Sequence, residues 1–305
     1  MSYQHFNRDR RIALGVLLYE GFNQKDAARS LGVHPSTIGR ELKRNLKEDG
    51  RYHATHAQVL ARTRRKDSKK KYRKIENDQE LEERIESMLH PLVSPEVVAH
   101  ELGITHETIY AWIYRSRTDL KSKLPYRGKK RRRYGIKRQE KQGWTKEVRS
   151  IDERPDTNHG WEGDTVIGST KSRLLTHVER ESLFAVVDLL PSGEAGDVHQ
   201  KMKENEVLHE SIITYDRGSE FSLWRMIEKD TDSKVFFANS HHPWERGKNE
   251  NTNGRLRRVF PKGFDFGTIK QKEIDRVVWL MNHTKRKSLD WRSPCRVFGK
   301  CCTSS

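Results

Sequence analysis

The apolar positions follow two different patterns along this chain of 305 residues. In the first part they are spaced for helices: Ile38 and Leu42 lie four residues apart, as do Ile109 and Ile113, so each pair falls on one helix face. From Gly160 onward the apolar residues form short continuous runs rich in β-branched side chains, which are typical of strands. The pattern therefore predicts a helical N-terminal part followed by an α/β part.

The elements of the α/β part can be placed in order. We expect strands over residues 161–168, 173–178 and 183–190, a helix over 198–208, a strand over 211–215, a helix over 221–229, a strand over 234–238 and a helix from about Trp244. Three consecutive strands followed by alternating helices and strands predict a mixed five-stranded sheet with flanking helices.

One motif occurs twice in the helical part. Ala28 precedes Gly32 by four residues and Ile38 by ten, and the same residue types recur at the same intervals 71 residues later, from Ala99 to Ile109. A small Ala lets two helices cross closely, and the Gly permits the backbone conformation of a tight turn. Each copy therefore predicts a helix-turn-helix, whose second helix enters the major groove of DNA.

The exposed face of each second helix is the candidate DNA-reading surface. Ser36 and Thr105 are the expected residues at the helix starts, because short hydroxyl side chains cap free backbone N–H groups. Trp112 and Tyr114 leave a second role open for the later copy, as a packing or dimerisation module. The candidate DNA contacts are Ser36, Thr37, Arg40 and Arg44 in the first copy, and His106, Glu107 and Arg115 in the second.

The net charge of +17 is concentrated in the first half of the chain. Residues 1–150 contain 35 Lys and Arg against 19 Asp and Glu, whereas residues 151–305 contain 25 against 24. This asymmetry indicates that the first half binds a polyanion. Basic runs at 62–74 and 127–138 contact phosphates, serve as solvated tethers, or do both. The candidate phosphate contacts in the second run are Lys129, Lys130, Arg131, Arg132 and Arg133.

Composition favours a multidomain protein, because 34% of the residues are charged and only 33% are hydrophobic. The cysteines, from Cys295 onward, lack a zinc-binding spacing, and no apolar run approaches the roughly 20 residues of a membrane span. We therefore expect a cytoplasmic protein. The expected domains are a first helix-turn-helix domain at 1–60, a basic linker at 61–78, a second helix-turn-helix domain at 79–118, a basic linker at 119–155 and a catalytic α/β domain at 156–305.

Two aspartates lie where strands are predicted. Asp164 interrupts an otherwise apolar strand, and Asp216 follows a short strand directly. Neighbouring carboxylates are costly unless a cation lies between them, so the pair predicts a metal site. Glu250, with 33 residues between it and Asp216, is the candidate third ligand. On a helix it shares a face with Gly254 and Arg257, and the arginine would lie close to a phosphate backbone.

Other roles for these acids are open when each is taken alone. A single strand Asp is often an edge or cap residue, and a single helix Glu is often solvated. Glu245 competes for the third position but points to another side of the same helix. Glu162 shares the strand face of Asp164 and is a candidate to support it. His241 and His242 are candidate DNA contacts or supporting residues.

Longer blocks of sequence resemble one family. The segments WEGD (161–164), TYDRGSEF (214–221) and WERGKNENTNGRLRRVFPKG (244–263) resemble the signature blocks of the IS30 family of bacterial DDE transposases. The first helix-turn-helix, SPEVVAHELG, THETIYAWIY and the closing RKSLDWRSPCRVF are also similar to that family, so the likeness covers nearly the whole chain. Arg217 stands where the family usually has Asn, and the sequence leaves the effect of this difference on activity open.

The resemblance implies a ribonuclease-H-like core with Asp164, Asp216 and Glu250 as the catalytic, metal-binding acids. It implies two Mg²⁺ ions, for which Mn²⁺ can substitute, and double-stranded DNA as the partner, both terminal inverted repeats and target DNA. It also implies at least a homodimer. The reaction would be 3′-end cleavage followed by strand transfer, with no small-molecule substrate and no membrane. Two alternatives are a DNA-binding regulator without activity and a nuclease that cleaves without joining.

Overall fold

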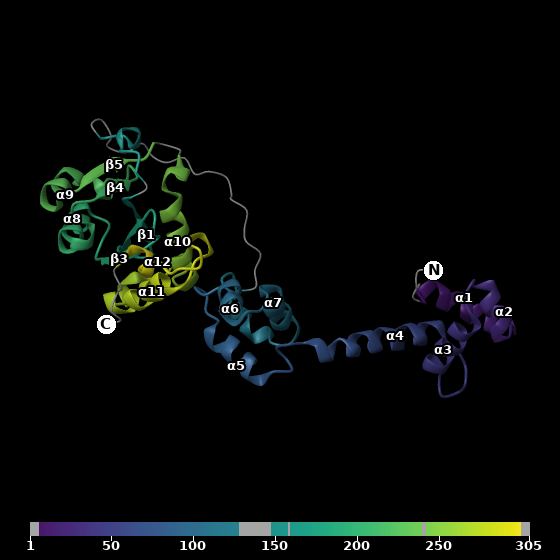
Figure 1. The fold of residues 1–305 in the computed structure, drawn as a ribbon. Coiled ribbons are helices and arrows are strands. Elements are labelled where there is room, and N and C mark those ends of the chain that lie inside the picture. Colours follow the sequence, from purple (N-terminus) through teal and green to yellow (C-terminus); the bar gives the residue numbers. More distant parts are fainter. Residues whose placement is uncertain (1–5, 128–147, 158, 240–241, 300–305) are drawn as a thin grey trace. The chain divides into compact units, whose positions relative to one another are not determined.

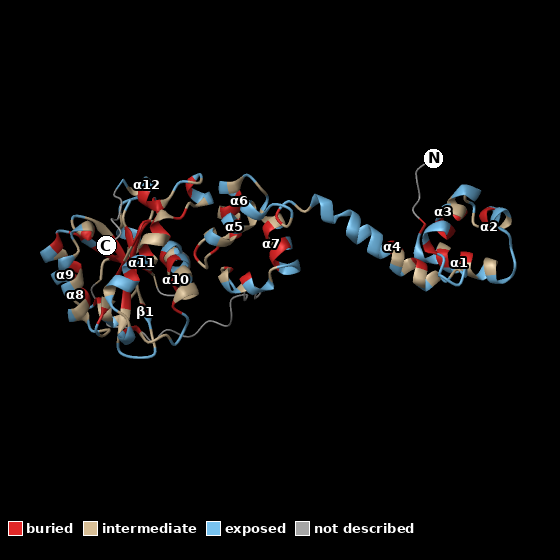
Figure 2. Cartoon of the chain, turned by 90° about the horizontal axis from the view of Figure 1, so that it is seen from below, coloured by how far each residue is buried: buried red, intermediate tan, exposed pale blue. Residues whose placement is uncertain are grey.

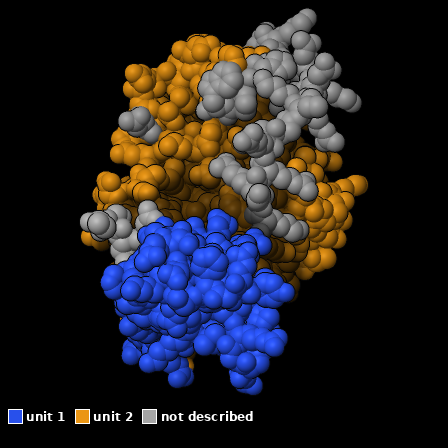
Figure 3. Space-filling model, turned by 90° about the vertical axis from the view of Figure 1, so that its right-hand side faces the viewer, with its two compact units in different colours: residues 1–82 blue, residues 83–305 orange. Residues whose placement is uncertain are grey.

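The computed structural model describes residues 6–127, 148–157, 159–239 and 242–299 (Figure 1). The chain divides into two compact units, Met1–Glu82 and Glu83–Ser305 (Figure 3). Among the described residues, no helix combines the length and the apolar character needed to cross a membrane.

Unit 1 is helical. Its elements are α1 (Arg8–Tyr19), α2 (Gln24–Ser30), α3 (Pro35–Asn45), α4 (Ala54–Ser68) and a 3-10 turn (Lys70–Tyr72). The core is formed around Leu14, Ala28 and Ile38, which are fully buried. Gly32 adopts a φ of +62° between α2 and α3, a conformation that glycine reaches at low cost. The predicted small residue, turn and apolar anchor are therefore confirmed in the first motif.

The start of α3 differs from the expectation for Ser36. His34 is the residue that caps this helix, and its ring Nδ1 accepts a hydrogen bond from the Ser36 backbone N–H (3.2 Å). Pro35 occupies the first helical turn, where its fixed φ suits the helix and its missing N–H costs nothing. Ser36 is therefore the second residue of α3 and not its cap, and its side chain is exposed.

Helix α4 runs across the boundary expected at residue 60. Its first turns pack on α1 and α3 through the buried Ala57 and Ala61. Every residue from Arg62 to Lys70, in contrast, is exposed (Figure 2). Arg64 donates to the backbone oxygen of Arg44 (3.0 Å) and so connects α4 to the end of α3. The first part of the basic run is thus an exposed helix, because the alanines of α4 that pack on the core, Ala57 and Ala61, both precede it.

Unit 2 begins with the second helical motif. Its elements are α5 (Gln79–Met88, which starts in unit 1), α6 (Pro95–Leu102), α7 (His106–Arg115) and a 3-10 turn (Thr118–Lys123). Ala99, Ile109 and Ile113 are buried, and Gly103 has a φ of +64°, so the predicted helix-turn-helix geometry is present here too. Thr105 is the residue before α7, as predicted, although its side chain makes no capping hydrogen bond.

The second motif packs against the C-terminal part of the same unit. His100 of α6 stacks on Trp291, with ring centroids 4.0 Å apart, and Lys285 pairs with Glu101 at 2.6 Å. Arg255 donates to the backbone oxygen of Leu92 (2.9 Å). The face of α6 therefore contacts the α/β part, while Trp112 is buried within the motif.

The α/β part contains the predicted mixed sheet. The strands are β1 (Trp161–Ile167), β2 (Arg173–Glu179), β3 (Ala185–Leu190), β4 (Ile212–Tyr215) and β5 (Lys234–Phe237), in the order β3-β2-β1-β4-β5. β1, β2 and β3 pair antiparallel, whereas β4 pairs parallel with both β1 and β5. The fold class predicted from the sequence is therefore confirmed.

Helices cover both faces of the sheet. α8 (Ala195–Glu204) and α9 (Trp224–Thr231) cover one face, and α10 (Gly247–Val259) and α11 (Gln271–His283) the other (Figure 1). A short helix, α12 (Pro294–Phe298), follows, and 3-10 turns occupy Ile151–Glu153, Glu206–Leu208, Ser219–Phe221, Pro243–Arg246, Phe266–Thr268 and Lys287–Leu289. The last predicted helix begins at Gly247 rather than Trp244, because a 3-10 turn precedes it.

Candidate active site

The two aspartates lie side by side because β1 and β4 are adjacent parallel strands. Glu162 pairs in register with Thr214, and two residues further along the chain stand Asp164, within β1, and Asp216, directly after β4. A step of two residues returns a strand to the same face, which here is the face covered by α10. The structure therefore brings these two carboxylates together, while their shared role in a site stays a prediction.

A guanidinium group lies between the two carboxylates. Arg246, the last residue before α10, places Nη2 3.2 Å from Asp216 Oδ2 and Nη1 3.8 Å from Asp164 Oδ1. Its side chain is only 16% exposed, while those of Asp164 and Asp216 are 28% and 31% exposed. The two carboxylates are thus partly open to solvent, and the Arg246 guanidinium partly neutralises their charge.

The environment disfavours a charged Asp164. Burial, followed by the neighbouring Asp216 carboxylate, raises the pKa of Asp164 to about 6, although Arg246 acts in the opposite direction. Glu220 contributes further repulsion and accepts a hydrogen bond from the Thr165 hydroxyl (2.7 Å). Negative charge is therefore crowded here, which is the electrostatic condition of a cation site.

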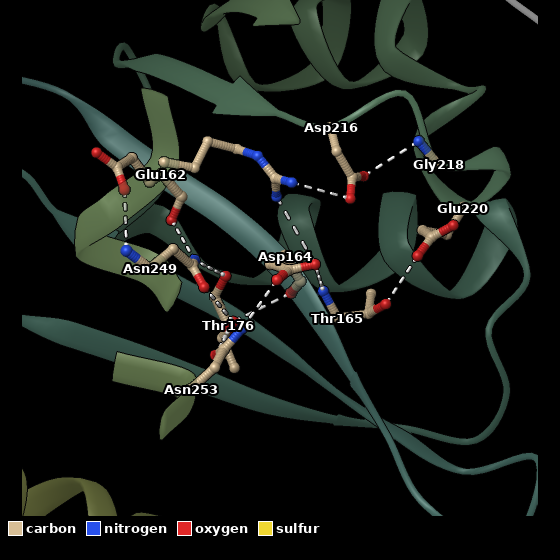
Figure 4. A network of polar contacts seen from close by, with 10 residues as sticks. Glu162, Asp164, Thr165, Thr176, Asp216, Gly218, Glu220, Asn249 and Asn253 are labelled. Atoms are coloured by element: carbon tan, nitrogen blue, oxygen red, sulfur yellow. Dashed lines mark hydrogen bonds and ion pairs between the residues drawn. The ribbon is translucent and has the colours of Figure 1, made fainter. Parts of the chain in front are cut away.

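Helix α10 is joined to the sheet by a buried polar network (Figure 4). The Asn249 backbone N–H donates to Glu162 Oε2 (2.9 Å), and the Asn249 side chain donates to the backbone oxygens of Glu162 (2.7 Å) and Thr176 (3.2 Å). One turn later, the Asn253 amide donates to Asp164 Oδ2 (2.9 Å). Glu162, expected to support Asp164, instead holds the first turn of α10, which in turn holds Asp164.

Glu250 lies in that first turn, beside the buried Asn249, and its side chain is exposed. In the described part of the chain, no three acidic, histidine or cysteine side chains converge into a group ready to hold a metal ion. The structure therefore brings Asp164 and Asp216 together but does not gather Glu250 with them. The two aspartates nonetheless fit a divalent cation, since their hard oxygen donors already share one positive group.

The competing residues lie elsewhere. Glu245 Oε2 accepts from the Asn239 backbone N–H (2.8 Å), and Glu245 Oε1 is 3.1 Å from His242 Nδ1. Glu245 and His242 therefore organise the loop after β5 and do not join the aspartates. His241 lies outside the described residues.

The candidate DNA contacts are mostly at the surface. Ser36, Arg40 and Arg44 are exposed on α3, and Thr37 is half-buried. On α7, Glu107 and Arg115 are exposed, and the half-buried His106 pairs with Glu107 at 3.3 Å. Arg257 of α10 donates to the backbone oxygen of Ile167 (2.6 Å), and burial lowers its pKa. Lys129, Lys130, Arg131, Arg132 and Arg133 lie outside the described residues.

Sequence reasoning missed four residues of the site: Arg246, Glu220, Asn249 and Asn253. The two asparagines carry a usable signal, because a spacing of four on a helix puts both side chains on one face. Arg246 and Glu220 carry none, since their roles depend on segments that are distant in the sequence.

The sheet order, the helices on both faces and the paired carboxylates give unit 2 a ribonuclease-H-like α/β core. At the other end of the chain, residues 2–45 match the family model described as a helix-turn-helix domain. Among solved structures, the catalytic core domain of BIV integrase is similar with a TM-score of 0.37 and 16% identity, covering 47% of this chain and 94% of that one.

Curated relatives match along nearly the whole chain. The transposase of insertion sequence IS1086 from Cupriavidus metallidurans is 30% identical, covering 98% of this chain and 95% of that protein. The IS4351 transposase from Bacteroides fragilis is 30% identical over 97% and 95%, and the InsI transposase of IS30A from Escherichia coli is 30% identical over 96% and 83%. The chain belongs to the IS30 family of insertion-sequence transposases, as its sequence blocks indicated.

Proposed function

We propose that this transposase binds the terminal inverted repeats of its own insertion sequence and catalyses metal-dependent 3′-end cleavage followed by strand transfer. The observation that carries the proposal is the pair Asp164 and Asp216, held on adjacent parallel strands and sharing one guanidinium. In a family of transposases, such a pair is the natural centre of phosphoryl transfer.

Asp164, Asp216 and Glu250 are the residues that would hold the divalent metal, with two Mg²⁺ ions as the preferred occupants and Mn²⁺ as a substitute. When bound, the metal supplies a stabilising charge for the attacking and leaving oxygens of the phosphodiester. Glu250 is proposed as the third ligand because it precedes Asn253 by three residues on α10, and the Asn253 amide bonds to Asp164.

The protein groups orient the reaction. Asn253 fixes Oδ2 of Asp164, and the Gly218 backbone N–H fixes Oδ1 of Asp216 (3.1 Å). Water first attacks the phosphodiester at the end of the element and frees a 3′-hydroxyl group. That hydroxyl then attacks a phosphate of the target DNA. Arg257, at the end of the same helix, would contact the phosphate backbone.

DNA recognition is assigned to the two helix-turn-helix motifs. The exposed side chains of α3 and α7 would enter major grooves, and the basic run at 127–138 would contact phosphates. Because two ends of one element must meet, we infer a homodimer or larger assembly on DNA, working on the nucleoid in the bacterial cytoplasm.

The test uses purified protein and labelled DNA that carries the ends of its own element, with and without Mg²⁺. Nicking and strand joining that require Mg²⁺ and disappear in Asp216→Ala and Glu250→Gln would support the proposal. End-specific binding without cleavage would favour the regulator. Cleavage without joining would favour a simple nuclease, and full cleavage by Glu250→Gln would remove that residue from the proposed ligand set.

A further inference from the structure

Arg246 occupies the position that a cation would need in order to contact both aspartates. Its Nη2 and Nη1 atoms reach Asp216 and Asp164 at 3.2 and 3.8 Å, and the arginine side chain is less exposed than either carboxylate. The two carboxylates come from segments that are distant in the sequence, and the Arg246 guanidinium contacts both of them. A guanidinium and a divalent ion cannot both fill this position.

The contact is not built as a permanent ion pair. The Arg246 Nε atom is buried and has no hydrogen-bond partner among the described residues. The separation from Asp164, 3.8 Å, exceeds the length of a hydrogen bond. The buried pair of unit 1 is different: Arg11 reaches both carboxylate oxygens of Glu41, at 2.7 and 3.1 Å. Arg246 therefore compensates charge without forming the full set of bonds that would lock it in place.

Each aspartate is also oriented by hydrogen bonds that do not involve Arg246. Asp164 accepts from the Thr165 backbone N–H (2.8 Å) and from Asn253 (2.9 Å), and Asp216 accepts from the Gly218 backbone N–H (3.1 Å). None of these three bonds involves the guanidinium, so its withdrawal would not by itself remove them. The carboxylates would then be left in place with their mutual repulsion uncompensated, which favours the entry of another cation.

We propose that Arg246 is a placeholder cation that stabilises Asp164 and Asp216 in the metal-free protein and competes with the divalent metal for them. The inference rests on the metal site of the proposed function. It makes Arg246 a residue that tunes metal affinity, and it predicts opposite effects on stability and on metal binding when the arginine is removed.

The test compares full-length wild-type protein with Arg246→Gln in two measurements without DNA: Mn²⁺ binding by calorimetry and the melting temperature in the absence of metal. Arg246→Gln should bind Mn²⁺ about tenfold more tightly, because a charge-assisted contact of this kind is lost from the competing state. Its metal-free melting temperature should fall, because the two carboxylates then repel each other without compensation. A residue that only supports the fold would weaken both properties together, and that result would overturn the proposal.

Two arginine variants serve as controls. Arg217→Gln removes the same charge next to Asp216, but the Arg217 Nε donates to the backbone oxygen of Ala238 (3.3 Å) instead of a carboxylate. It should leave Mn²⁺ affinity within about twofold of wild type. If it tightens binding as much as Arg246→Gln does, the cause is general charge and the proposal fails. Arg246→Lys keeps the charge and should retain most of the competition.

Asp216→Asn separates this inference from the proposed function. If wild type and Asp216→Asn bind Mn²⁺ equally, the metal site itself is wrong and the inference falls with it. If Asp216→Asn loses Mn²⁺ but Arg246→Gln binds it as wild type does, the metal site stands and the placeholder role of Arg246 is refuted.

Discussion

The buried ion pair of unit 1 offers the sharpest test of what holds α3, the second helix of the first helix-turn-helix, in place. Arg11 of α1 and Glu41 of α3 form two bonds, from Nε to Oε1 (2.7 Å) and from Nη2 to Oε2 (3.1 Å), and their side chains are only 5% and 8% exposed. The Tyr52 hydroxyl donates to the same Oε1 atom (3.1 Å). Arg11→Ala would leave Glu41 buried with a single neutral donor.

The expected loss is about 3–5 kcal/mol, the usual cost of removing one partner from a buried pair. A unit of this size has a total stability of roughly 5–15 kcal/mol, so the loss is a large part of it. The double variant Arg11→Met with Glu41→Leu should recover most of the stability, because it removes both charges and keeps apolar volume. The penalty therefore comes from the stranded carboxylate and not from lost packing.

The two units can be followed separately in the full-length chain. All seven tryptophans lie at or after Trp112, so tryptophan fluorescence reports on unit 2 alone. Amide hydrogen exchange in α1 and α3 reports on unit 1. Arg11→Ala should increase exchange in those helices and leave the urea midpoint of the fluorescence transition unchanged. A loss below about 1 kcal/mol, or a double variant as unstable as the single one, would refute the reasoning.

Three further outcomes are expected. Gly163→Ala should lower the stability of unit 2 by about 1–3 kcal/mol in urea unfolding, since a Cβ there would clash with the buried Tyr215 ring; an unchanged midpoint would contradict this. Burial lowers the pKa of His177 to about 3, below the usual 6.5 or so, so the unfolded chain takes up a proton first on acidification. The free energy of unfolding of unit 2 should therefore fall by roughly 2 kcal/mol between pH 6.5 and pH 5 in urea titrations. The same titrations of His177→Gln should show no such fall, and an equal fall in that variant would contradict the assignment to His177. Arg40→Ala should weaken binding to the element ends by about 1–3 kcal/mol in competition assays while sparing non-specific DNA; equal loss on both would assign Arg40 to phosphates.

The helix-turn-helix motifs and the sheet could be predicted because their signals are local. Helical spacing, a turn glycine and a small crossing residue are set by backbone geometry within about twenty residues. Each copy of the motif supports the interpretation of the other, since Ala28 and Ala99 begin the same pattern. Domain boundaries were harder to predict than elements. Helix α4 continues past residue 60 to Ser68, and helix propensity alone does not show where along such a helix the tertiary packing ends.

The sequence by itself determined the family, through its signature blocks, and predicted the class of site from two aspartates and a later glutamate. Only the tertiary structure decided how that site is built. The pairing of β1 with β4 brings Asp164 to Asp216 across 52 positions of the chain, and the turn before α10 places Arg246 between them. Glu162 bonds to the start of α10 rather than to Asp164, and Glu250 is left exposed. Such relations depend on contacts between distant segments, whose energies no local pattern of residues encodes.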